Sequence, residues 1–454
     1  MGGRPIHKLP KAHLHLHLTG AMRHSTLVEL ARDHGIGLPD ALAADWPPRL
    51  RGTDERGWFR FQRLYDIARS VLRGPADVQR LLREAAEDER SEGSGWLEIQ
   101  FDPSGYAGRF GGLTPAVELV LDAAARASRA TGVGVGVIVA ANRTKHPLDA
   151  RTLARLAAQY AGDGVVGFGL SNDERRGPAG AFAAAFRIAA RAGLIAVPHG
   201  GELAGPDSVY ACLTELNADR IGHGVRAAED PALTRLLAAR RTVLEVCPTS
   251  NVALGVAGRA EDVPLRTLRD AGVQMALGAD DPLLFGTRLA AQYELARHTH
   301  QFSDQELAEF ARTSVHGSAA PDHVRATLLA GIDAWLAAPG EASVDHHGPE
   351  RGLGGPSRPP AGLAAPSRPP AGLAAQLRPY ARRPHRRRGP TGARGPTGAA
   401  RGAAGVGPMG GGARRETEPR AGESQVQADE HWFVDEYHAK HVPHGVPDIA
   451  GERH

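Results

Sequence analysis

The amino-acid sequence predicts an α/β fold: a (β/α)8 TIM barrel with extra helices, followed by a disordered C-terminal tail. Short apolar segments with the composition of buried strands alternate with amphipathic helical patterns, and this alternation repeats eight times over about 270 of the 454 residues. A change of composition near residue 340 predicts the tail. An open, doubly wound sheet is the competing architecture.

Eight segments have the length and apolar content of strands in a buried parallel sheet. They span residues 13–19, 96–103, 133–141, 165–172, 194–199, 220–225, 242–248 and 274–280. The segments between them show helical spacing, as in the apolar face formed by Val78, Leu81, Leu82, Ala85 and Ala86. The repeated strand–helix order favours the barrel.

Two helix starts are marked by capping residues. Thr114 followed by Pro115 predicts an N-cap with proline at the first helical position. Ser303 and Glu306 have the spacing of a capping box.

Composition divides the chain into three parts: a barrel domain over residues 1–340, a Pro/Gly/Ala/Arg-rich segment over 341–430, and an extension over 431–454 to which the sequence assigns no role. A ten-residue repeat, Pro-Ser-Arg-Pro-Pro-Ala-Gly-Leu-Ala-Ala, starts at residues 356 and 366. The segment has too few apolar side chains to offset chain entropy, so we expect it to be disordered.

Charge and cysteine content narrow the class of protein. The formal net charge is +3, but residues 351–420 hold fourteen Arg and two Glu, a net of +12, so the remaining residues carry −9. Basic charge that favours nucleic-acid binding therefore lies in the tail, and a nucleic-acid partner is only a minor alternative. With two Cys, no membrane-spanning apolar run and no visible secretory signal, we expect a cytoplasmic protein without a membrane partner. The sequence indicates no oligomeric state.

The first predicted strand carries histidine at every second residue: His13, His15 and His17. Alternate residues of a strand share a face, so all three imidazoles are expected to point into the barrel. A His-x-His pair can chelate one divalent ion, although a hydrogen-bonded structural pair is the alternative.

Further polar residues follow later strands, at the barrel end where active sites form. His199 closes the fifth strand and precedes Glu202, His223 lies in the sixth, and Asp280 and Asp281 close the eighth. Three histidine nitrogens and one carboxylate suit Zn²⁺ with one position left for water. This set consists of His15, His17, His199 and Asp280.

These motifs together resemble the adenosine deaminase family, a mononuclear-zinc branch of the amidohydrolase barrels. The resemblance covers about residues 8–335. Its motifs are residues 9–20 (Leu-Pro-Lys-Ala-His-Leu-His-Leu-His-Leu-Thr-Gly), 199–202 (His-Gly-Gly-Glu), 222–224 (Gly-His-Gly), 245–248 (Glu-Val-Cys-Pro) and 280–282 (Asp-Asp-Pro).

The resemblance implies hydrolytic deamination of a 6-aminopurine nucleoside, a small-molecule substrate, with release of ammonia. It implies one Zn²⁺ per chain on the four ligands named above. Glu202 would protonate the purine at N1, His223 would orient and activate the attacking water, and Asp281 would bind N7 and align the nucleophile. The backbone near Asn172 would reach N3. His13 stands where many relatives carry Glu and is not implied as a ligand.

The chain departs from the family pattern at the sugar-binding side. Thr19 replaces an Asp that contacts the ribose 5′-hydroxyl, and Asn172 replaces a Gly. A 5′-modified nucleoside, 6-amino-6-deoxyfutalosine of menaquinone biosynthesis, is therefore the main alternative substrate.

Other enzyme classes fit less well. Residues 165–172 hold no Lys, which disfavours a binuclear amidohydrolase, whereas a mononuclear pyrimidine-base deaminase stays open. Cys212 and Cys247 lie too far apart for the Pro-Cys-x-x-Cys motif of the other zinc nucleobase deaminases. A non-catalytic barrel is disfavoured because every implied site residue is present.

Overall fold

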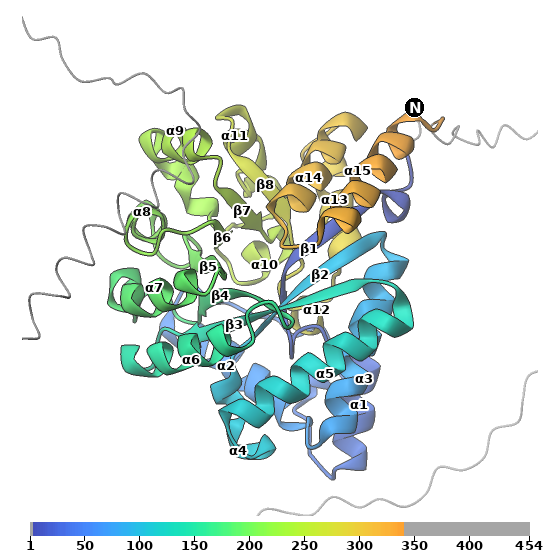
Figure 1. Ribbon diagram of the computed structural model, residues 1–454. Coiled ribbons are helices and arrows are strands. Elements are labelled where there is room, and N and C mark those ends of the chain that lie inside the picture. The colour runs from blue at the N-terminus through green and yellow to red at the C-terminus, as the bar shows by residue number, and fades with distance from the viewer. Residues whose placement is uncertain (1–2, 340–454) are drawn as a thin grey trace, which may run out of the picture. The chain divides into compact units, whose positions relative to one another are not determined.

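The computed structural model describes residues 3–339, and these residues contain a barrel of eight parallel strands (Figure 1). The strands pair in chain order, each with the next. Each of them overlaps one of the eight segments predicted from the sequence. The strands are β1 (Lys11–His17), β2 (Ser94–Phe101), β3 (Gly134–Asn142), β4 (Val165–Ser171), β5 (Ile195–Gly200), β6 (Arg220–His223), β7 (Val243–Val246) and β8 (Gln274–Leu277).

The backbone of Asp280, just past β8, closes the barrel. The amide of His17 donates to the carbonyl of Asp280 at 3.0 Å, and the amide of Asp280 donates to the carbonyl of His15 at 3.1 Å. The first and last strands are therefore neighbours, which excludes the open doubly wound sheet. The same two hydrogen bonds set the carboxylate of Asp280 beside the end of β1.

Helices between successive strands surround the barrel (Figure 1). Their apolar faces pack on the outer face of the strands in two large clusters, and the helix face predicted at Val78–Ala86 is buried in one of them. The helices after β1 to β4 are α1 (His24–Asp33), α2 (Glu55–Ser70), α3 (Pro75–Ser91), α4 (Ala107–Phe110), α5 (Leu113–Thr131), α6 (Pro147–Gln159) and α7 (Ala183–Arg191). Those after β5 to β8 are α8 (Pro206–Glu215), α9 (Pro231–Arg240), α10 (Pro248–Ala253), α11 (Leu265–Asp270), α12 (Pro282–Phe285), α13 (Leu289–His298), α14 (Asp304–Gly317) and α15 (Asp322–Ala337).

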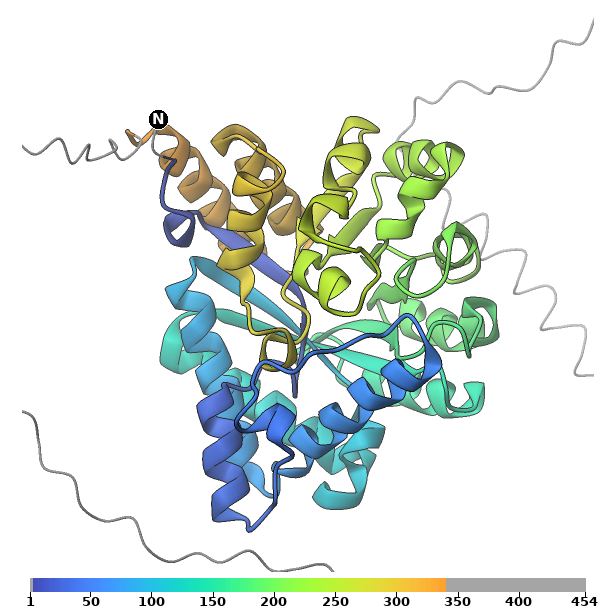
Figure 2. The same ribbon diagram turned by 180° about the vertical axis from the view of Figure 1, so that it is seen from behind.

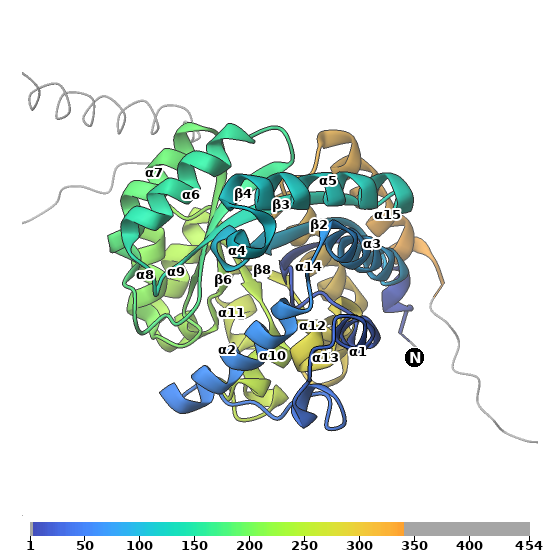
Figure 3. The ribbon, with the colours of Figure 1, turned by 90° about the horizontal axis from the view of Figure 1, so that it is seen from below.

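Helix α2 belongs to the extra structure between β1 and β2. The segment that contains it crosses the end of the barrel (Figure 2), and Figure 3 places α2 at the same end as α10 and α12, which follow β7 and β8. The carboxyl ends of the strands are therefore covered in part by this helix.

The two capping predictions had different outcomes. Ser303 caps α14 and forms the predicted box with Glu306. Thr114 is not an N-cap, because α5 begins at Leu113 after Gly112. Pro115 is tolerated inside the first turn since amides there have no partner within the helix.

The expectation that three histidines of β1 share one face is wrong for His13. Its Nδ1 lies 2.7 Å from Oε1 of Glu89 on α3, and its Nε2 accepts from the amide of Ala279 at 3.0 Å. The pairing of β1 with β2 shifts register between His13 and Leu16, which interrupts the alternation of faces. His13 is therefore part of the packing between strand and helix.

No helix within residues 3–339 is long and apolar enough to cross a membrane. The predicted tail and the C-terminal extension lie outside the described residues.

Candidate metal centre and active site

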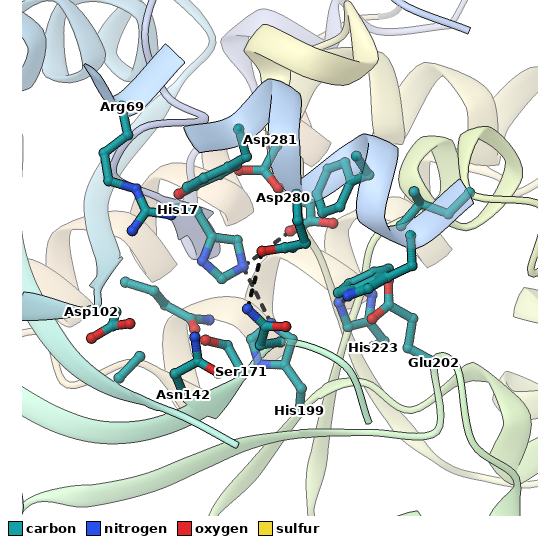
Figure 4. Close-up of a pocket in the computed structure, with 18 of the residues that line it drawn as sticks. His17, Arg69, Asp102, Asn142, Ser171, His199, Glu202, His223, Asp280 and Asp281 are labelled. Atoms are coloured by element: carbon teal, nitrogen blue, oxygen red, sulfur yellow. Dashed lines mark hydrogen bonds and ion pairs between the residues drawn. The ribbon is translucent and has the colours of Figure 1, made fainter. Parts of the chain in front are cut away.

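The ends of three strands bring the four predicted ligands to one point inside the barrel. His15 and His17 come from β1, His199 from β5, and Asp280 follows β8. Figure 4 shows His17, His199 and Asp280 close together. Their candidate ligand atoms fall in groups in which all atoms lie within 4.8 Å of one another. Residues more than 260 positions apart in the chain thus form one cluster.

Distances within the cluster match the size of a tetrahedral metal site. Nε2 of His17 lies 3.2 Å from Nε2 of His199 and 3.2 Å from Oδ1 of Asp280, and Nε2 of His15 lies 3.5 Å from the same oxygen. With metal–ligand bonds of about 2.0–2.1 Å, two ligand atoms of a tetrahedron lie about 3.3 Å apart. These three distances are compatible with a metal site that these four side chains share.

A buried ion-pair chain orients His15. Its Nδ1 lies 2.8 Å from Oε2 of Glu245, and Arg220 donates from Nε to Oε1 of Glu245 at 2.6 Å and from Nη2 to Glu98. Among the described residues, Nε2 of His15 makes no hydrogen bond and faces the cluster. A carboxylate on the far nitrogen of a ligand histidine is a common way to fix its tautomer.

Electrostatics of the cluster favour a positive charge at His15. Burial lowers the pKa of His15, but the nearby carboxylates of Asp280 and Glu245 outweigh burial and raise the pKa to about 10. A proton stabilised there competes with a cation for the same carboxylates. The carboxylates of Asp280 and Glu245 therefore attract positive charge to this place, as a cation site requires.

Two of the site residues adopt left-handed backbone conformations that non-glycine residues rarely adopt. The φ angle is 61° at Asp280 and 62° at His223, and Asn172 nearby has 82°. Such conformations cost about 1–3 kcal/mol each and cluster at functional sites. All three residues lie at the end of a strand or shortly after it, where this backbone conformation sets the direction of the side chain.

A pocket opens from the cluster, and it contains the predicted catalytic side chains. Glu202, His223, Asp280 and Asp281 line it, and Figure 4 shows Glu202 and His223 on one side, with Arg69 and Asp102 on the other. Nε2 of His223 lies 3.7 Å from Oε1 of Glu202.

The carboxyl groups of Glu202 and Asp281 favour the protonated state. Burial raises the pKa of Glu202 well above its usual range, and the nearby carboxylates of Asp280 and Glu174 raise it further. Burial and Asp280 likewise raise the pKa of Asp281. Burial lowers the pKa of His223 to about 3, so its imidazole is neutral. The pocket thus combines carboxyl proton donors with a neutral imidazole.

The two predicted substrate-binding residues are placed differently. Asn172 lines the pocket, and its side chain donates to Oε1 of Gln62 at 3.1 Å. Thr19 is fully buried, and its hydroxyl lies 2.5 Å from the hydroxyl of Tyr106, which lines the pocket in its place.

Sequence reasoning missed the wall that α2 contributes. Trp58, Phe61 and Tyr65 lie on this wall at spacings of three and four residues, together with Gln62 and Arg69. The guanidinium carbon of Arg69 lies 5.2 Å from the ring centre of Tyr65. The regular aromatic spacing was a signal, but it is the same signal that a helix packed on the core gives.

The fold and the site together define a class of protein. Three histidines and one aspartate at the rim of the barrel, beside the carboxyl of Glu202 with its raised pKa, are typical of a metal-dependent hydrolase. The chain belongs to the adenosine deaminase family, whose sequence model matches residues 10–335. It is accordingly a hydrolase that acts on C–N bonds of cyclic amidines.

Individual relatives cover the same part of the chain. A putative adenosine/adenine deaminase from Streptomyces virginiae is 69% identical over 333 residues, which are 73% of this chain and 98% of that protein. An aminodeoxyfutalosine deaminase from Acidothermus cellulolyticus is 33% identical over 64% of this chain and 83% of its own length. The crystal structure of an adenine deaminase from Arthrobacter aurescens matches with a TM-score of 0.67 and 30% identity, over 72% of this chain and 99% of that one.

Proposed function

We propose that the protein removes the 6-amino group of a purine by hydrolysis, with one Zn²⁺ held by His15, His17, His199 and Asp280. The observation that carries this proposal is the geometry of the pocket: four ligand atoms at tetrahedral spacing lie beside a buried carboxyl whose pKa is raised. The relatives named adenosine/adenine deaminase and adenine deaminase support the choice of a 6-aminopurine.

A bound zinc ion would lower the pKa of water toward neutrality and so make hydroxide available at neutral pH. The remaining work belongs to the chain's own side chains. Attack at C6 places electron density on ring nitrogen N1, and a purine accepts that density only if N1 receives a proton. Glu202 lines the pocket, its raised pKa favours the protonated form, and it would donate this proton.

His223 and Asp281 would hold the reactants. The neutral imidazole of His223 can accept a hydrogen bond from the attacking water and orient it toward C6. The raised pKa of Asp281 favours its protonated form, and its Oδ1 has no hydrogen-bond partner among the described residues, so it is available to the purine N7. Asn172, the residue directly after β4, would bind N3 through its backbone.

A specific observation favours the free base adenine over its nucleoside. The residue expected to bind the ribose, Thr19, is covered by Tyr106, and Tyr65 and Arg69 complete the same wall. The free base has no ribose and needs no contact from residue 19. A nucleoside would lack the Asp carboxylate that the family pattern places at this position to bind the ribose 5′-hydroxyl. We therefore rank adenine first, adenosine second and 6-amino-6-deoxyfutalosine third.

Parallel assays of purified protein with adenine, adenosine, AMP and 6-amino-6-deoxyfutalosine test the proposal. The conversion of a 6-aminopurine to a 6-oxopurine is followed by ultraviolet absorbance, and ammonia release by a coupled assay. Turnover of adenine with the largest kcat/KM is the expected result. A failure to deaminate any of these 6-aminopurines would overturn the proposed function.

A further inference from the structure

The loop that carries Glu202 is attached to a second carboxylate that takes no part in the chemistry described above. Glu174 follows β4 and is 6% exposed. One of its oxygens, Oε2, accepts hydrogen bonds from the amides of Glu202 at 3.0 Å, Leu203 at 2.7 Å and Ala204 at 2.9 Å. The other, Oε1, accepts from the amide of Gly201 at 2.5 Å and from the hydroxyl of Ser208.

Four successive backbone amides therefore converge on one side chain. Successive amides that point into a concavity form a nest, a structure that ordinarily binds an anion from outside the chain. Here the anion is supplied by the protein itself. Gly201 has a φ of 69°, the left-handed conformation that turns its amide inward with those that follow.

The segment around Glu174 is itself fixed to the metal-ligand strand. Arg143, buried just after β3, donates from Nη1 to the carbonyl of Gly177 at 2.9 Å and from Nη2 to the carbonyl of His199 at 2.5 Å. The ends of β3 and β5 and the loop after β4 are thus joined by buried polar contacts. Glu174 is held at a fixed place relative to His199.

We propose that Glu174 is a positioning residue, which holds the Gly201–Ala204 turn so that the carboxyl of Glu202 faces the reacting ring nitrogen. This inference rests on the proposed function, because it assigns Glu174 to the proton-donation step. Glu174 also contributes, after burial and Asp280, to the raised pKa of Glu202. A displacement of a catalytic group by about 1 Å costs about a hundredfold in rate, so the position of this turn matters.

Three variants test the inference. Glu174→Gln keeps the size of the side chain but replaces one acceptor oxygen with an NH2 group that cannot accept from the amides. Glu174→Asp keeps the carboxylate but shortens its reach, and it serves if the Gln variant does not fold. Glu84→Gln is the matched control, since Glu84 is a buried carboxylate on α3 that accepts from Thr26 and Arg80, away from the pocket.

Two measurements are made on each folded, metal-loaded variant. Hydrogen exchange, read by mass spectrometry, reports on the peptide that contains residues 201–204. Steady-state kinetics with adenine give kcat and KM separately. In Glu174→Gln we expect faster exchange in this peptide and a kcat lowered about a hundredfold. KM and metal content should be close to wild type, and Glu174→Asp should recover part of the loss.

The control separates positioning from general stability. Glu84→Gln should lower the melting temperature without changing kcat per folded enzyme or exchange at residues 201–204. If Glu174→Gln keeps the wild-type kcat, or if only KM changes, the inference is overturned while the deaminase assignment stands. If the wild-type protein deaminates no 6-aminopurine, the proposed function fails, and the exchange data still show whether Glu174 holds the turn.

Discussion

Replacement of Glu202 by Gln is the sharpest perturbation of the proposed proton donor. Glutamine fills the same volume in the buried pocket but has no proton to give. The raised pKa of Glu202 favours the neutral form of the wild-type side chain, so the substitution by a neutral amide changes the charge of the pocket less than it would at an ordinary glutamate. The fold, the metal ligands and substrate affinity should be preserved, and only proton donation is removed.

The expected magnitude follows from the role. A positioned general acid contributes about 10²- to 10⁴-fold to the rate. Each tenfold corresponds to about 1.4 kcal/mol, so the barrier should rise by about 3 to 5 kcal/mol. Because N1 is protonated only as C6 is attacked, this loss should fall on kcat, with KM nearly unchanged.

The assay compares kcat, KM, metal content and melting temperature of the variant with those of wild type. Glu118→Gln, at an exposed position of α5 away from the pocket, is the control and should behave as wild type. A Glu202→Gln variant that keeps its metal and the wild-type kcat would refute the assignment of Glu202 as the proton donor.

Three further predictions concern pH and the metal site. The pKa of Glu202 is raised, so its protonated form is present below that pKa and is lost as pH rises through it. The kcat of the wild-type enzyme should therefore fall on the alkaline side of the pH profile. The same alkaline fall in Glu202→Gln would contradict this prediction. Glu245→Gln should weaken metal affinity about 10- to 100-fold in chelator competition, because it replaces the carboxylate beside Nδ1 of His15 with a neutral, weaker acceptor. Unchanged affinity would show that this contact does not matter. His13→Gln should keep the wild-type metal affinity while losing about 1–3 kcal/mol of stability in denaturant unfolding, since His13 contacts Glu89, and loss of the metal would refute its placement.

The barrel and the metal cluster could be predicted because their signals are local in the sequence. Each strand is a short apolar run, and the metal-site residues lie near the end of such a run or shortly after it, so a closed parallel barrel brings them together without further information. His199 could be placed from its position near the end of β5, and Asp280 from its position after β8. The order of these residues along the chain also matches the order of the family motifs.

Other features depend on contacts that no local pattern encodes. The change of face at His13 arises from a register shift between β1 and β2, which alternation alone cannot reveal. The cover of Tyr106 over Thr19 joins residues 87 positions apart. The nest around Glu174 likewise forms only when the loop after β4 meets the turn after β5.

The central claim is that a single zinc ion at the barrel rim is needed for deamination, and metal titration tests it most directly. Protein stripped with a chelator is assayed with adenine while Zn²⁺ is added back, with His199→Ala as the variant that lacks a ligand. Activity should rise in proportion to bound zinc and level off at one ion per chain, and the variant should stay inactive. Full activity of metal-free protein would contradict the account.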